Sequence, residues 1–174
     1  MAAPTKPMSK AETRAAIESF VKAWNDHDVD AIVDHTTGDV LWTNPATGGA
    51  VHGKDAARAD TEAVFTAMPD LHFPMEDFKT FTTDDPEVAM ATWTITGTMT
   101  GPMAGFAPTG KRARFRGVCV YKFRDGLFAE HTIVFDGVDF LQQLGLLPRE
   151  KDLSYKAMAQ FQHLTTRVQK LLRR

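Results

Sequence analysis

The spacing of apolar residues changes once along this chain, and that change restricts the possible folds more than any other feature. Before residue 71, apolar side chains recur at the three- and four-residue intervals of helices, whereas after it they recur at alternate positions, as in strands. We expect these later strands at 71–82, 88–100, 113–123 and 127–135. Helices followed by a run of antiparallel strands are typical of an α+β domain.

The first part of the chain contains three expected helices and one strand. Ser9 and Glu12 form a capping box, which begins a helix. We expect Asp30 to cap a short second helix, and residues 53–68 to form a third helix that Pro69 ends. A strand at 40–44 lies between them and ends at the turn formed by Gly48 and Gly49.

The chain after residue 136 is expected to be helical again. Residues 139–147 begin a short helix, and residues 152–174 form a long one with an apolar stripe from Leu153 to Leu171. Such a stripe predicts packing, either on the domain or on a partner subunit. The expected organisation is a disordered leader at 1–8, one domain at 9–148 and a C-terminal helical extension at 149–174.

Charge and cysteine content exclude several classes of function. The 20 basic and 22 acidic residues give a net charge of −2, which argues against a nucleic-acid partner. No stretch approaches the roughly 20 apolar residues of a membrane helix, and the N-terminus has no secretory signal, so we expect a cytoplasmic protein without a membrane partner. The single cysteine, Cys119, excludes an intrachain disulfide and a cysteine-rich zinc site. We expect neither a metal nor another cofactor.

Several short segments, in this order and spacing, resemble the SnoaL-like polyketide cyclases of the nuclear transport factor 2 and ketosteroid isomerase superfamily. They are WNDHD at 24–28, PDLHF at 69–73, PTGK at 108–111, FRGV at 115–118, the pairs at 125–126, 130–131 and 135–136, and LQQLGLLP at 141–148. The resemblance covers residues 9–148. It implies a cone in which N-terminal helices pack on a strongly curved antiparallel sheet that encloses one pocket, and a cyclase-like or isomerase-like enzyme that forms a dimer.

Strand alternation predicts which residues of the last hairpin face that pocket. With a three-residue loop between Phe123 and Leu127, Cys119 lies opposite His131. Residues 131, 133 and 135 then face the pocket, and 130, 132 and 134 face outward. The outward valines Val118, Val120 and Val134 among charged residues suggest the contact surface of a homodimer.

Two polar residues are candidates for chemistry. His131 is the one strongly polar residue on the inward face and could give or take a proton, although a histidine among apolar residues is often a packed core residue. Because burial disfavours the imidazolium, we expect its pKa below the usual value. Asn44 could orient a carbonyl or a water, although it also suits the turn before Pro45. The expected ligand-contacting residues are Phe20, Trp24, Trp42, Met68, Trp93, Phe106, Cys119, Tyr121, Ile133 and Phe135.

One position departs from the family that the chain resembles. The polyketide cyclases carry a catalytic carboxylate two residues after the histidine, where this chain has Ile133. Two main interpretations therefore stay open. The first is an enzyme that performs cofactor-free cyclisation, isomerisation or dehydration on an apolar, carbonyl-bearing ligand such as a polyketide. The second is a non-catalytic protein that binds a hydrophobic ligand in the same pocket. A third, an interaction module built on the outer sheet face, would need no polar group in the pocket.

Overall fold

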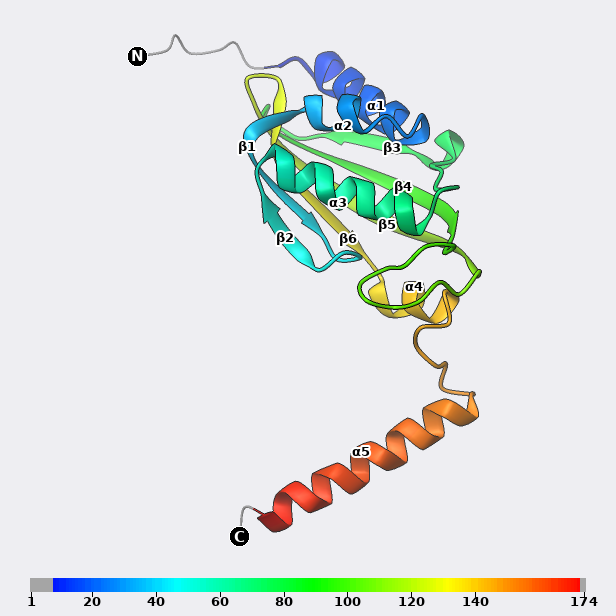
Figure 1. Ribbon diagram of the computed structural model, residues 1–174. Coiled ribbons are helices and arrows are strands. Elements are labelled where there is room, and N and C mark those ends of the chain that lie inside the picture. The colour runs from blue at the N-terminus through cyan, green and yellow to red at the C-terminus, as the bar shows by residue number, and fades with distance from the viewer. Residues whose placement is uncertain (1–7, 173–174) are drawn as a thin grey trace.

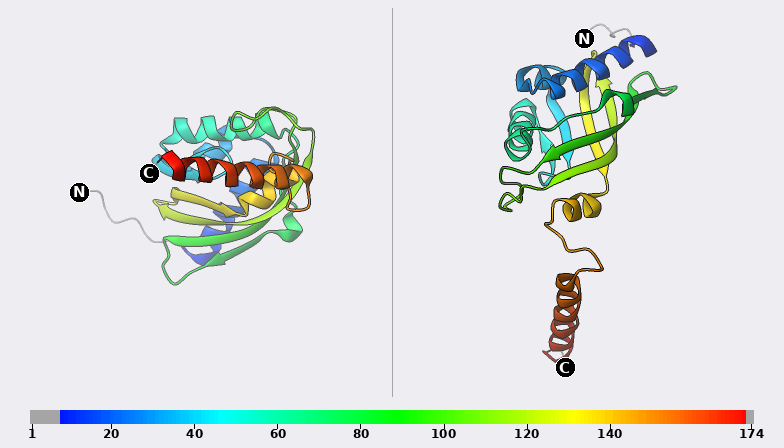
Figure 2. Two further views of the ribbon diagram at one scale, coloured as in Figure 1. Left: turned by 90° about the horizontal axis from the view of Figure 1, so that it is seen from below. Right: turned by 90° about the vertical axis from the view of Figure 1, so that its right-hand side faces the viewer.

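The computed structural model describes residues 8–172, except for the side chains of residues 158, 163, 164 and 167–172. Three N-terminal helices lie over one face of a curved sheet, as Figures 1 and 2 show. The sheet has six strands in the order β2-β1-β6-β5-β4-β3. This confirms the expected α+β fold.

The helices and strands follow the predicted order. The helices are α1 (Lys10–Asn25), α2 (Val29–Asp34), α3 (Lys54–Ala67), α4 (Gly137–Gln143) and α5 (Leu153–Leu172), with a 3-10 turn at Met75–Asp77. The strands are β1 (Thr36–Asn44), β2 (Gly49–His52), β3 (Lys79–Thr82), β4 (Val88–Thr98), β5 (Arg112–Arg124) and β6 (Leu127–Phe135).

Local sequence signals explain the ends of several helices. Ser9 accepts the backbone N–H of Glu12, whose side chain accepts the N–H of Ser9, so the predicted capping box is present. Asp28, rather than the predicted Asp30, caps α2 by accepting the backbone N–H of Ala31. The expected strand at 71–82 is also wrong over its first half, because Pro74 begins the 3-10 turn and regular pairing starts only at Lys79.

One strand pair differs from the antiparallel arrangement of the others. β1 pairs with β6 in parallel, with Trp42 beside His131, while its other edge pairs antiparallel with β2 through the Gly48–Gly49 turn. The four-residue strand β2 was not predicted. The parallel pair places Trp42 against the strand that carries His131.

The register of the β5–β6 hairpin differs from the prediction by two residues. Arg124 pairs with Leu127, so the loop contains only Asp125 and Gly126, both at positive φ, as a two-residue hairpin turn requires. An irregularity follows, because Lys122 pairs with Glu130 but Phe123 pairs with Phe128. Consequently Tyr121, and not Cys119, lies opposite His131, and Cys119 lies opposite Ile133.

The predicted faces of β6 survive this error because a shift of two residues preserves the alternation of side chains. His131, Ile133 and Phe135 line the interior, and Val134 is exposed on the opposite face, as predicted. Before the irregularity, Phe128 is buried in place of the expected Leu127 and Ala129.

Helix α5 extends away from the rest of the chain (Figure 1). Leu153 and Phe161 on its apolar stripe are 84% and 68% exposed. Packing of this helix on its own domain is therefore wrong, and packing on a partner subunit stays a prediction. Leu171, at the end of that stripe, lies beyond the described side chains, as residues 1–7 of the expected leader lie outside the described chain. None of the helices between residues 8 and 172 has the length and apolar content that a membrane crossing requires.

Candidate functional site

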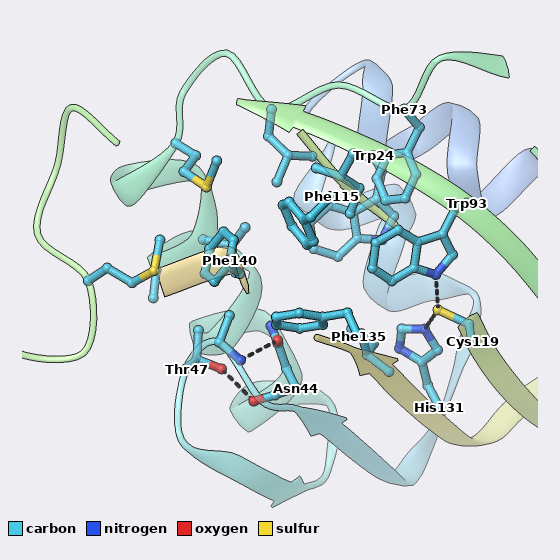
Figure 3. Close-up of a pocket in the computed structure, with 18 of the residues that line it drawn as sticks. Trp24, Asn44, Thr47, Phe73, Trp93, Phe115, Cys119, His131, Phe135 and Phe140 are labelled. Atoms are coloured by element: carbon cyan, nitrogen blue, oxygen red, sulfur yellow. Dashed lines mark hydrogen bonds between the residues drawn. The ribbon is translucent and has the colours of Figure 1, made fainter. Parts of the chain in front are cut away.

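A pocket lies between the helices and the concave face of the sheet, with a free volume of about 140 Å³. Its walls are mainly aromatic rings from α1, the strands and α4, several of which Figure 3 shows converging on one space. These rings are Phe20, Trp24, Phe73, Trp93, Phe115, Tyr121, Phe135 and Phe140. Among the described lining residues there is no Asp, Glu, Lys or Arg. The site therefore selects an uncharged, largely apolar ligand.

His131 is the ionisable side chain of this pocket whose usual pKa lies near neutral pH, and it is 1% exposed. Its ring stacks on Tyr121 at a centroid distance of 5.1 Å and meets the edge of Trp42 at 4.3 Å. Burial among these rings lowers the pKa of His131 to about 3, because the charged imidazolium loses its hydration. The histidine is therefore neutral at physiological pH, as the sequence predicted.

The two ring nitrogens of His131 have different surroundings. Nε2 lies 3.3 Å from the Sγ atom of Cys119. Nδ1 is buried, and no group of residues 8–172 forms a hydrogen bond with it. A buried polar atom without a partner is rare in folded proteins and indicates that a ligand or a water supplies the partner.

Cys119 lies between His131 and Trp93 (Figure 3). The indole Nε1–H of Trp93 donates to Sγ across 3.1 Å. Burial raises the pKa of the Cys119 thiol to about 12, although hydrogen bonds from Tyr121 and Trp93 partly oppose that increase. Cys119 is thus a protonated thiol rather than a nucleophilic thiolate.

Gly117 allows Trp93 to reach this position. The two residues are direct partners in neighbouring strands, and a Cβ on Gly117 would lie 2.4 Å from the Trp93 ring. Any larger residue at 117 would push the indole aside. The glycine therefore fixes the donor that reaches the Cys119 sulfur.

Asn44 lines the pocket, but its amide is mostly engaged by the protein. Its Oδ1 accepts the backbone N–H of Ala46 at 3.1 Å, and its Nδ2 donates to Asp60 at 3.0 Å. This leaves one amide N–H for a ligand. Asn44 thus combines the two roles that the sequence left open, because it shapes the turn and also reaches the pocket.

Asp60, on the buried side of α3, is a carboxylate that the sequence analysis missed. It accepts the indole Nε1–H of Trp42 at 2.9 Å, the amide of Asn44 and the hydroxyl of Thr47. Three donors satisfy this carboxylate and join α3 to β1 and its following turn. The signal was its place at helical spacing between the buried Ala57 and the pocket-lining Val64.

We expect Asp60→Ala to lower the free energy of unfolding by about 3–5 kcal/mol, because three buried donors lose their acceptor. Chemical denaturation measures this change. Asp55→Ala in the exposed first turn of the same helix is the matched control and should cost less than about 1 kcal/mol. Equal losses in the two variants would contradict a role for Asp60 in joining the helix to the strand.

Most of the predicted contact residues do line the pocket, and two do not. Trp42 is fully buried behind His131 and forms no part of the wall. Phe106 is 47% exposed, because the loop between β4 and β5 turns it outward and places Met103 on the pocket side instead. The other eight predicted contact residues, together with His131 and Asn44, are at the wall. No metal-binding group of three or more His, Cys, Asp or Glu occurs within the described part of the chain.

Several solved structures are similar to this one. AclR from Streptomyces galilaeus, proposed to be a hydroxylase, is 26% identical with a TM-score of 0.68, and the match covers 92% of this chain and 98% of AclR. TsrD from Streptomyces laurentii is also 26% identical, with a TM-score of 0.67 and coverage of 80% and 99%. A proposed polyketide cyclase from Xanthomonas campestris shares the fold at 16% identity, with a TM-score of 0.70 and coverage of 78% and 98%.

No curated protein matches the chain. The model of one family does match, and it covers residues 14–144, from the first helix to the end of α4. On that match, this chain belongs to the SnoaL-like polyketide cyclase family.

Proposed function

We propose that this protein is a cofactor-free enzyme that uses His131 in acid–base chemistry on an apolar, carbonyl-bearing small molecule. Cyclisation, isomerisation and dehydration all belong to this class, since each proceeds through an enol or enolate. The observation that carries the proposal is the buried, neutral His131 with Nδ1 lacking a protein partner. An uncharged imidazole in a water-poor pocket interacts strongly with an oxygen on which charge develops.

The rest of the pocket supports the same chemistry. Its aromatic walls accept an unsaturated ring system, and Asn44 and Thr47 add polar groups at one side, as Figure 3 shows. The family, and the cyclase and hydroxylase names of its structural neighbours, also support an enzyme that acts on small organic molecules.

A binding protein without catalysis is the second candidate, and Ile133 favours it. Ile133 lies at the pocket wall where the resembled cyclases carry their carboxylate, so the pocket lacks that acid–base group. Such a protein would hold the same class of ligand and leave it unchanged.

Deuterium exchange of 1-tetralone separates these two candidates. Hydrogens on the carbon next to the carbonyl exchange with D₂O only through the enol, and proton NMR follows their loss. We expect binding, measured by quenching of tryptophan fluorescence, together with exchange well above the solvent rate. Saturable binding with exchange at the solvent rate would contradict the enzyme and favour the binding protein. Tetralin, which lacks the carbonyl, is the binding control.

We also propose a homodimer through the outer face of the sheet. Val134 and Met90 on this face are 55% and 38% exposed, and Val118 and Val120 beside them are partly exposed. An apolar patch of this kind on an exposed sheet usually marks a contact surface. Sedimentation velocity at micromolar concentration should show a dimer, and a monomer alone would contradict this.

A further inference from the structure

The surroundings of the Cys119 sulfur restrict how its own proton can be placed. A neutral thiol has two acceptor lone pairs and one S–H. Trp93 is necessarily a donor to Sγ, since an indole nitrogen accepts no hydrogen bond. The hydroxyl of Tyr121 also interacts with this sulfur. These two donors use the two lone pairs.

The remaining neighbour of the sulfur is Nε2 of His131, at 3.3 Å. If Nε2 carried a proton, three donors would converge on one neutral sulfur. If Nε2 carries a lone pair instead, the S–H has a strong acceptor and every group around the sulfur is paired. The second arrangement satisfies more buried polar groups and is therefore favoured.

From this geometry we propose that Cys119 is a positioning residue that donates its S–H to Nε2 of His131 and thereby fixes the Nδ1–H tautomer. Neutral His131 then offers a ligand an N–H donor at Nδ1, the atom that has no partner among the described residues. The group that fits this donor is an oxygen acceptor such as a carbonyl or enolate oxygen. This inference rests on the proposed function and deepens it, because it assigns His131 to the oxygen of the substrate rather than to its carbon.

The tautomer is observable without any substrate. In protein labelled with ¹⁵N-histidine, long-range ¹H–¹⁵N correlation spectra distinguish a neutral ring protonated at Nδ1 from one protonated at Nε2. We assign the His131 signals by their loss in His131→Gln. The expected result for the wild type near neutral pH is protonation at Nδ1. Protonation at Nε2 would overturn the proposal.

Three variants separate positioning from packing. Cys119→Ala removes the donor to Nε2, so His131 should lose its preference for the Nδ1–H form. Cys119→Ser restores an O–H donor at the same place and should restore that preference. Trp93→Phe removes a donor to the sulfur but leaves the S–H, so the tautomer should not change. A tautomer that is unchanged in Cys119→Ala would overturn the proposal.

Failure of this inference is distinguishable from failure of the proposed function. The tautomer is measured in the resting protein, whereas the function is measured by exchange of 1-tetralone. With both correct, Cys119→Ala slows exchange by roughly tenfold, the effect of one lost hydrogen bond, and Cys119→Ser recovers most of it. Exchange that depends on His131 in a protein protonated at Nε2 would leave the enzyme standing and remove the role of Cys119.

Discussion

Acid should destabilise this protein through His131, and His131→Leu should remove that part of the acid sensitivity. The folded-state pKa of His131 is about 3, against about 6.5 in an unfolded chain. Between those values the unfolded state binds a proton that the folded state does not, so unfolding takes up a proton. The free energy of unfolding therefore falls as the pH falls below about 6.5, and the fall ends near the folded-state pKa.

The expected size of this effect is large for one side chain. Each pH unit inside the window changes the free energy of unfolding by about 1.4 kcal/mol, so roughly 3 kcal/mol is lost between about pH 7 and pH 4. Chemical denaturation across this range measures it. The quantity to compare is the slope of stability against pH, because His131→Leu also changes packing at every pH.

Carboxylates do not obscure this comparison. Asp39 and Asp70 have pKa values lowered mainly by hydrogen bonds, from Arg124 for Asp39 and from Thr98 for Asp70 against an opposing burial effect. Their stabilisation is lost only as the pH falls through their usual range and below, and it is the same in both proteins. Parallel slopes for the wild type and His131→Leu between about pH 6.5 and pH 4 would show that His131 is not buried in its neutral form.

The sequence predicted the pocket more accurately than the contacts within it. Inward placement of His131, Ile133 and Phe135 depends only on alternation, which a register shift of two residues does not disturb. The partner of His131 depends on the exact loop and on the irregularity beside Phe123, which the Asp-Gly turn alone does not reveal. The arrangement of Cys119 between Trp93 and His131 was unpredictable for the same reason.

Asp60 and Phe106 show two other limits of the sequence. Asp60 was overlooked because a charged residue is usually exposed, and its three donors come from the end of β1 and the turn after it, which are remote in sequence. Phe106 was expected inside because it is aromatic, but its loop has Gly105 at positive φ and Met103 on the pocket side. Neither result follows from periodicity, because each depends on tertiary contacts.

The exchange rate of 1-tetralone in His131→Ala, measured against the wild type at saturating ligand, tests the central claim most directly. We expect a loss of about 10²–10⁴-fold, the usual contribution of one acid–base group, with an affinity for 1-tetralone within a few-fold of the wild type. His52→Ala, which changes an exposed histidine of β2, is the matched control and should exchange at the wild-type rate. A His131→Ala protein that binds 1-tetralone and exchanges it as fast as the wild type would contradict the claim that His131 performs the chemistry.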